Sequence, residues 1–235
     1  MIYRYCEQCG KGFYCSRQSK KTCSNRCRQE RYRIAHSDKP RLKVLVACEK
    51  WGVVRDAFIA RGHDAVSCDL DPTQRPGPHI QGDVRPILED EWDIVIAFPP
   101  CTYLTQTSAP ALKQAPLTRL RGMVEAIRFF KLCQAANAPR VAVENPRMLK
   151  IARMRLGDPS CKVQPWEHGD PWSKLTYLWL KGLPPLMPSY IVSGERSYID
   201  FIRRTRGSSI NSSKTRDLSS RTFPGIALAM AQQWG

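Results

Sequence analysis

From residue 43 onward, apolar runs of strand length alternate with segments that have helical spacing. The runs that predict strands are "KVLVAC" (43–48), "DAVSCDLD" (64–71), "WDIVIAF" (92–98) and "RVAVEN" (140–145). Helices are predicted over 52–62 and 117–137, where apolar residues recur at helical intervals. Strands that are connected through helices run parallel and are buried on both faces. The sequence therefore predicts an α/β fold with a doubly wound parallel sheet.

Reactive side chains follow three of these predicted strands. Asp69, Cys101 and Glu144 each lie at the carboxyl end of a strand. In open α/β sheets this edge holds the ligand-binding crevice, so we expect a functional site there. Taken singly, each residue has a structural alternative: a helix cap, a core thiol and a surface acid.

The loop after the third strand begins with two prolines. Pro99 and Pro100 have no N–H group to donate, so the strand cannot continue beyond Phe98. Cys101 is thereby placed on a stiff loop at the strand end. From the residues alone it is either a nucleophile or a small apolar residue.

The N-terminal segment has the cysteine spacing of a zinc site. Two close pairs are separated by thirteen residues, and they consist of Cys6, Cys9, Cys23 and Cys27. Four thiolates complete the tetrahedron that structural zinc prefers. The pattern resembles the short treble-clef zinc knuckles of the CxxCGKxF…CSxxCRxxxYR type. Cys15 is left as a spare thiol, and Ser24 or Asn25 is expected to cap a short basic helix.

The charge of the chain is strongly positive. Lys and Arg number 37 against 21 Asp and Glu, and residues 1–43 contain twelve of these cations and three acids. This balance favours nucleic acid as a partner over a merely solvated basic face. The cations expected to contact it in the first segment are Arg28, Arg31 and Arg33.

Two absences set the expected compartment. No apolar run reaches the roughly 18 residues that a membrane span needs, and the first residues lack a secretory signal. We therefore expect a cytoplasmic protein without a membrane partner, with reduced cysteines; for a phage-encoded chain this is the host cytoplasm.

The order of motifs in the main segment resembles the DNA (cytosine-5)-methyltransferase family, in particular its short phage and prophage members. The stretches that carry the resemblance span about residues 43–235: "VLVACEKWGVVRDAFIARGHDAVSCDLDP", "GDV", "FPPCTYLT", "AVENP", "GDPWSKLTYLWLKGLPP" and "RTFPGIALAMAQ". The fold implied is a Rossmann-like methyltransferase sheet.

The resemblance also implies roles for individual residues. Cys101 would add to C6 of a flipped cytosine in double-stranded DNA, and Glu144 would hold or protonate N3. Lys174 lies where the family has an arginine-bearing strand near the base. S-adenosylmethionine would lie over the first strands, with Asp69 on its ribose and Asp83 near its adenine amine. The other residues implied in cofactor binding are Ala47, Gly52 and Pro99. The last helix would close this site.

The chain departs from the family pattern at several positions. Cys48, Glu49 and Lys50 replace glycines of the first loop, Thr102 replaces a glutamine, and Asn-Pro replaces Asn-Val. The usual large target-recognition region is reduced to about residues 185–221. Its basic part is either a flexible loop or a phosphate-tracking segment that orders on DNA, with Arg203, Arg204, Arg206 and Lys214 as the cations expected to contact DNA.

These features predict a zinc knuckle over 1–36, a linker over 37–42 and a methyltransferase domain over 43–235. Two alternatives remain open at this point. The same fold could act on a free pyrimidine nucleotide or on RNA, as the short recognition region favours. The chain could also be a non-catalytic DNA-binding protein, although Cys101 and Glu144 together argue against it. The oligomeric state is not predicted.

Overall fold

The computed structural model describes residues 1–6, 8–9, 12–35, 40–105, 116–194, 196–206 and 213–235. For residues 34–35, 203, 205–206 and 213–216 only the backbone is described. In these parts of the chain, no helix is long and apolar enough to cross a membrane.

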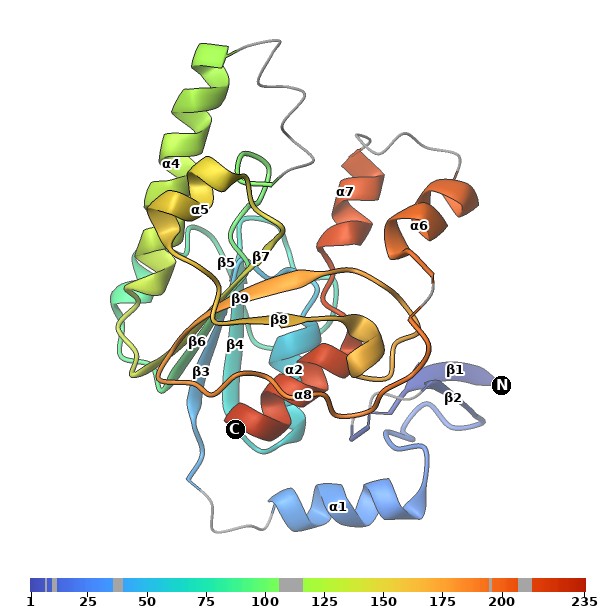
Figure 1. Ribbon diagram of the computed structural model, residues 1–235. Coiled ribbons are helices and arrows are strands. Elements are labelled where there is room, and N and C mark those ends of the chain that lie inside the picture. The colour runs from blue at the N-terminus through green and yellow to red at the C-terminus, as the bar shows by residue number, and fades with distance from the viewer. Residues whose placement is uncertain (7, 10–11, 36–39, 106–115, 195, 207–212) are drawn as a thin grey trace.

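A seven-stranded sheet forms the centre of the molecule, as Figure 1 shows. Its strands, in spatial order, are β5 (His79–Gln81), β4 (Asp64–Asp69), β3 (Lys43–Ala47), β6 (Ile94–Ala97), β7 (Arg140–Pro146), β9 (Thr176–Lys181) and β8 (Cys161–Val163). The first five run parallel, whereas β9 is antiparallel to both β7 and β8. The predicted α/β class is confirmed, and the antiparallel β9 makes the sheet mixed.

Helices cover both faces of this sheet. On one face α2 (Val53–Ala60) packs against α8 (Pro224–Trp234), and on the other α4 (Pro116–Gln134) packs against α5 (Lys150–Leu156). Strand β3 supplies both cores: Val44 and Val46 belong to the α2 side, and Leu45 and Ala47 to the α4 side. Burial on both faces explains why the strand reads as an unbroken apolar run.

The strand order reverses between β3 and β6. The chain proceeds from β3 outward to β4 and β5, then returns to β6 on the other side of β3. Their last residues, Ala47 and Ala97, are paired in the ladder. A crevice at such a reversal, outside the carboxyl ends of the strands, is the usual ligand site of an open α/β sheet.

The N-terminal segment forms a small lobe at the periphery (Figure 1). It contains an antiparallel hairpin of β1 (Ile2–Tyr5) and β2 (Gly12–Cys15), followed by α1 (Asn25–Ala35). Ser24 caps α1, because the N–H of Cys27 donates to its hydroxyl at 3.2 Å.

The described parts of the segment 185–221 are largely helical rather than one continuous loop. They include α6 (Tyr198–Arg206) and α7 (Ser213–Ser220). Trp172 anchors α6, with its ring 4.6 Å from that of Phe201 and 5.6 Å from that of Tyr198. Two short 3-10 turns, η1 (Ile87–Glu89) and η3 (Pro165–Glu167), complete the described elements.

Candidate functional site

Three ionisable side chains meet beyond the carboxyl ends of β6 and β7. Cys101 follows β6, Glu144 lies near the end of β7, and Lys174 comes just before β9, which pairs with β7. The charges of Glu144 and Lys174 act on the pKa of Cys101 and on each other's, and the charge of Cys101 acts on that of Lys174. The fold therefore brings together Cys101, Glu144 and Lys174, the three residues assigned to the reacting base from the sequence.

The Pro-Pro-Cys loop is held at both ends. The N–H of Phe98 donates to the carbonyl of Ala47 at 3.0 Å, which continues the ladder to the last residue before the prolines. Pro99 is buried and Pro100 is exposed. The carbonyl of Cys101 then accepts from the N–H groups of Leu104 and Thr105, at 3.0 and 3.2 Å. This turn fixes the position of the thiol.

Glu144 is a carboxylic acid that can stay neutral near pH 7. Burial raises its pKa to about 7, and the ammonium of Lys174 opposes that rise only in part. A carboxyl group with this pKa can either donate or accept a proton at neutral pH, as general acid-base chemistry requires.

The thiol of Cys101 is protonated in this state of the protein. Burial, together with the Glu144 carboxylate, raises its pKa to about 11, and Lys174 opposes this rise. Neutralising Glu144 would remove one of the two causes that disfavour the thiolate. The ionisation of Cys101 is thus linked to the proton on Glu144.

Lys174 connects this cluster to α7. Burial lowers its pKa, which the negative charges of Glu144 and Cys101 oppose. Its ammonium donates to the carbonyl oxygen of Ser219 at 2.5 Å and lies 5.8 Å from the centre of the Phe223 ring. The lysine is therefore held between the two acidic groups and the C-terminal end of a helix.

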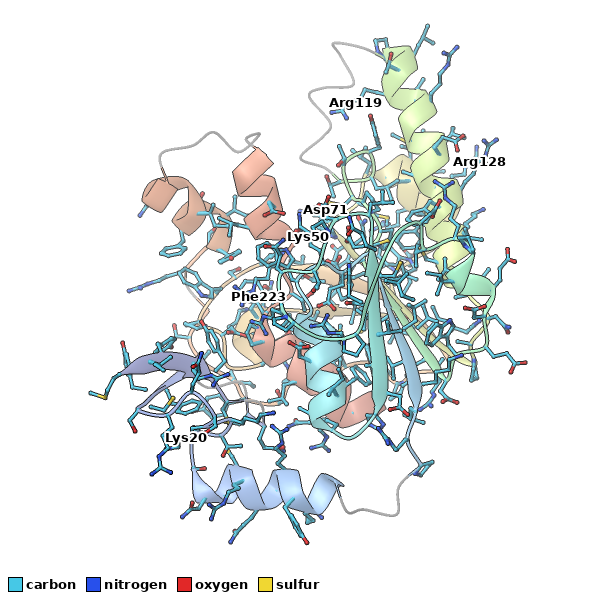
Figure 2. All side chains as sticks on the ribbon, turned by 180° about the vertical axis from the view of Figure 1, so that it is seen from behind. Lys20, Lys50, Asp71, Arg119, Arg128 and Phe223 are labelled. Atoms are coloured by element: carbon cyan, nitrogen blue, oxygen red, sulfur yellow. The ribbon has the colours of Figure 1, made fainter. Side chains whose placement is uncertain are left out.

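Two more contacts fasten α7 to the loop after β3. Lys50 forms ion pairs with Asp217 at 2.5 Å and with Asp71 at 2.8 Å, and the indole N–H of Trp51 donates to the hydroxyl of Ser220 at 3.3 Å. Figure 2 shows Lys50 beside Asp71, with Phe223 nearby. Helix α7 thus forms one wall of the candidate site.

The loop after β3 keeps a tight turn without the expected glycines. Cys48 has a φ of 58°, in the left-handed region that glycine adopts most easily. The buried carboxylate of Glu49 accepts from the N–H groups of Val54 and Arg55, at 2.7 and 3.3 Å, at the start of α2. Burial raises the pKa of Glu49 to about 7. Cys48, Glu49 and Lys50 stand where glycines were expected, and the turn after β3 still forms.

Asp69 and Asp83 both lie close to Cys48, beside the end of β3. Burial raises the pKa of the Cys48 thiol, and the charges of both aspartates contribute to the rise. Asp69 is half-buried and accepts from the N–H of Asp71 at 3.0 Å. Asp83 is exposed and pairs with Arg85 at 3.5 Å. Two carboxylates at this edge suit the hydroxyls and amines of a nucleoside cofactor.

Arg55 is a structural residue that periodicity did not identify. It is fully buried, and its guanidinium donates to side-chain oxygens of Asp56, Ser67 and Thr73. It also donates to three carbonyls of the loop after β4, those of Arg75, Pro76 and Pro78. A Cβ at Gly52 would lie 2.4 Å from this guanidinium, so Gly52 is needed for its approach.

The four N-terminal cysteines converge as predicted. The sulfur atoms of Cys6, Cys9, Cys23 and Cys27 all lie within 4.8 Å of one another. Cys23 has its sulfur 3.5 Å from that of Cys9 and 3.6 Å from that of Cys27. A zinc ion with Zn–S bonds of about 2.3 Å would separate its ligands by about 3.8 Å, so this cluster fits zinc. Cys15 lies outside it, with its thiol near the carbonyls of Ile2 and Arg17.

The expected nucleic-acid residues differ in how available they are. Arg28 is exposed, and Arg31 lines a cavity with it, whereas Arg33 already forms an ion pair with Glu30 at 2.8 Å. Arg204 is exposed on α6. The side chains of Arg203, Arg206 and Lys214 lie outside the described residues.

A second cavity, of about 850 Å³, opens at the opposite edge of the sheet. Lys43, Trp92 and Lys181 line it, at the amino ends of the parallel strands or the far end of β9. It is separated from Cys101 and Glu144 by the length of the sheet, and is not the candidate site.

No protein-family model and no curated protein matches this chain. Several solved structures of methyltransferases are similar to it in part. One, described as a DNA modification methyltransferase encoded within an E. coli prophage, has 17% identity and a TM-score of 0.42 over 65% of this chain and 52% of that one. The 16S rRNA methylase RmtB has 19% identity and a TM-score of 0.34 over 65% and 61%. The methyltransferase EhMeth of Entamoeba histolytica has 12% identity and a TM-score of 0.39 over 69% and 60%. The chain thus spans about half to three fifths of these proteins.

Proposed function

We propose that this protein transfers a methyl group from S-adenosylmethionine to C5 of a cytosine in DNA. The observation that carries the proposal is the meeting of Cys101, Glu144 and Lys174 at the end of the sheet where β6 and β7 finish and β9 begins. A thiol, a carboxyl group with a pKa of about 7 and a buried cation are the groups that activation of a pyrimidine through C6 requires.

Each of the three has a distinct role. The Cys101 thiolate forms a bond to C6, while Glu144 delivers its proton to N3 and draws electrons from the ring. The electron density that reaches C5 makes this carbon nucleophilic. After methylation, a water molecule takes the C5 proton and the electrons of that bond expel Cys101 from C6 as a thiolate. N3 returns its proton to the Glu144 carboxylate, which restores the ring. Lys174 favours the thiolate and balances the charge that Glu144 acquires.

S-adenosylmethionine supplies, when bound, a methyl group on a positively charged sulfur. The residues that would hold it are Asp69 and Asp83 by their carboxylates, and Ala47, Gly52 and Pro99 by the backbone around them. The nearness of both acids to the turn at Cys48 supports this assignment. The exposed ion pair of Asp83 with Arg85 must open for Asp83 to contact an adenine amine.

The N-terminal lobe would add the contacts that hold DNA. We infer that residues 1–36 are a zinc module, that 37–42 link it to a methyltransferase domain over 43–235, and that about 185–221 replace a larger recognition region. Arg28 and Arg31 would contact phosphates, and the flipped target base would lie between α7 and the Pro-Pro-Cys loop. Phosphate contacts offset part of the few kcal/mol that base flipping costs.

Methyl transfer can be tested on unmodified duplex DNA incubated with the zinc-loaded protein and S-adenosylmethionine. Mass spectrometry of the nucleosides is expected to show 5-methyldeoxycytidine with the wild type and with Cys161→Ala, whose thiol lies in edge strand β8. Cys101→Ala is expected to give none. Methylation at a ring or exocyclic nitrogen would contradict the C5 chemistry.

The covalent step has its own test. In an oligonucleotide with 5-fluorocytosine as target, C5 carries no proton to lose, so the bond between Cys101 and C6 should persist after methyl transfer. Peptide mapping should find the adduct at Cys101. If DNA is unmodified although it binds, RNA and free cytidine nucleotides are the next substrates; with no product from any of them, the protein is a non-catalytic binder.

A further inference from the structure

One face of the N-terminal hairpin consists of exposed tyrosines. Tyr3 and Tyr5 alternate along β1 and therefore point to the same side, and Tyr14 lies directly opposite Tyr3 in the ladder. The three side chains are 53%, 50% and 66% exposed. We call Tyr3, Tyr5 and Tyr14 the tyrosine face.

The three rings are held in place by one another. The ring of Tyr3 lies edge-on to that of Tyr5 at 5.7 Å and to that of Tyr14 at 5.0 Å. It also lies across Gly12, where a Cβ would come within 1.9 Å of the phenol oxygen. Glycine at position 12 therefore leaves room for a central ring packed on both sides, and the face is ordered before any ligand arrives.

The tyrosine face is not the core of the lobe. The opposite face of the hairpin contains Cys15, which is buried, and Phe13, which packs under the ammonium of Lys20 at 5.9 Å. Figure 2 shows Lys20 between the hairpin and α1. The three tyrosine rings thus remain exposed to solvent, while the opposite face of the hairpin is the one that packs into the lobe. An exposed aromatic patch with polar surroundings is typical of a binding surface.

The charge of the lobe selects the kind of ligand. Residues 1–35 contain nine Lys and Arg and two Glu. A cavity of about 380 Å³ in the same lobe is lined by Lys20, Lys21, Arg28 and Arg31 together with polar side chains, and none of the described residues that line it is acidic. A ligand that satisfies both features has planar faces for the rings and phosphates for the cations.

We propose that the tyrosine face stacks on unpaired bases of a single-stranded nucleic-acid segment, whose phosphates are attracted by the positive charge of the lobe. In a duplex the base faces are stacked on each other and cannot reach three rings on an open sheet. Single strands expose them, and aromatic platforms beside a basic groove bind such strands without sequence preference. A proline-rich peptide would also stack on tyrosines, but it gives nine cations no counter-charge. This inference does not depend on methyl transfer.

The test uses the full-length protein and fluorescence anisotropy with a labelled 12-nucleotide oligothymidine and with a labelled duplex hairpin. Tyr5→Leu and Tyr14→Leu keep apolar bulk in the strands and remove the ring. We expect each to weaken single-strand binding on the order of tenfold and to leave duplex binding unchanged. Tyr14→Phe should bind like the wild type, because stacking needs the ring and not the hydroxyl.

Tyr32→Leu is the matched control, since this tyrosine is 66% exposed on α1 of the same lobe but outside the tyrosine face. It should bind both probes like the wild type. Circular dichroism verifies that each variant is folded. If Tyr14→Leu does not fold, the binding of Tyr5→Leu decides the test. Unchanged single-strand binding in the folded variants, equal losses for duplex and single strand, or displacement of the strand by a proline-rich peptide would overturn the proposal.

Discussion

The ammonium of Lys174 donates a hydrogen bond to the backbone carbonyl of Ser219, with 2.5 Å between the two atoms. Ser219 belongs to the last turn of α7, where unpaired carbonyls form the negative end of the helix. The same ammonium lowers the pKa of both Cys101 and Glu144. The position of α7 is therefore coupled to the ionisation of the candidate site.

Removing the charge of Lys174 should make Cys101 less reactive. In Lys174→Met the thiol loses the cation that lowers its pKa, so a smaller fraction is thiolate at a given pH. Alkylation of Cys101 by iodoacetamide, followed by mass spectrometry from pH 7 to 10, should be slower than in the wild type. In the wild type the rate should still be rising at pH 10, because burial raises the pKa of this thiol to about 11. A wild-type plateau below pH 9 would contradict the assignment.

Activity should depend on the proton of Glu144. Burial raises its pKa to about 7, so the neutral form that donates to N3 is present below pH 7 and is lost as the pH rises through that value. Glu144→Gln cannot donate a proton, and we expect it to reduce kcat by about a hundredfold or more. The variant should also lose the limb of the kcat–pH profile near pH 7. A residual limb in Glu144→Gln would assign it to another group.

Glu49 should contribute to stability as a buried helix cap. Glu49→Ala leaves the N–H groups of Val54 and Arg55 without an acceptor, at a cost on the order of 2 kcal/mol in the free energy of unfolding. Urea denaturation of both proteins measures this difference. Glu91→Ala is the matched control, because Glu91 is exposed and its removal should leave the free energy of unfolding unchanged. Glu144→Ala would not serve, because it also removes a charge of the candidate site.

The pH dependence of stability gives a second test at Glu49. Burial raises its folded pKa to about 7, above the usual value, so the folded protein binds this proton more tightly than the unfolded chain. The proton stabilises the fold at low pH, and this contribution is lost as the pH rises from about 4.5 to 7. Glu49→Gln lacks it, so the Tm of this variant relative to wild type should rise between pH 5 and pH 8. A constant difference would contradict the raised pKa.

The cysteine cluster should bind one zinc ion per chain. Cys9→Ser removes a ligand, and we expect zinc, measured by mass spectrometry of the metal, to fall to well below one equivalent. Cys15→Ser is the matched control, because its thiol lies outside the cluster. It should retain the metal. Equal zinc in both variants would exclude the proposed ligand set.

Sequence periodicity predicted the strands that are buried on both faces and the helices that bury one face. Strands β3, β4, β6 and β7 and helices α2 and α4 were expected within a few residues, because their apolar faces leave a clear pattern. Strands β5 and β8 are three residues long, too short for any period to be visible. Helices α6 and α7 were not predicted, since their segment reads as polar and basic.

The candidate site divides in the same way. Asp69, Cys101 and Glu144 could be predicted because strand ends in an α/β sheet converge in space. Lys174 was identified from the family resemblance and not from its position, because β9 runs antiparallel and reaches the site from its amino end. Glu49 and Arg55 were missed as structural groups, since a buried charge and a surface charge look alike in a sequence. Only the fold shows that Glu49 accepts from backbone N–H groups and that Arg55 donates to buried oxygens.

The loop after β4 and helix α7 are held in place by unequal numbers of bonds. From inside the core, the guanidinium of Arg55 donates to Asp56, Ser67 and Thr73 and to the carbonyls of the loop after β4. In the described residues, α7 is joined to the rest of the site by one ion pair from Lys50 and by hydrogen bonds from Trp51 and Lys174. Helix α7 therefore has fewer bonds to break than the loop after β4. Under the proposed function, a base that enters beside α7 would displace this helix before it displaces the loop after β4.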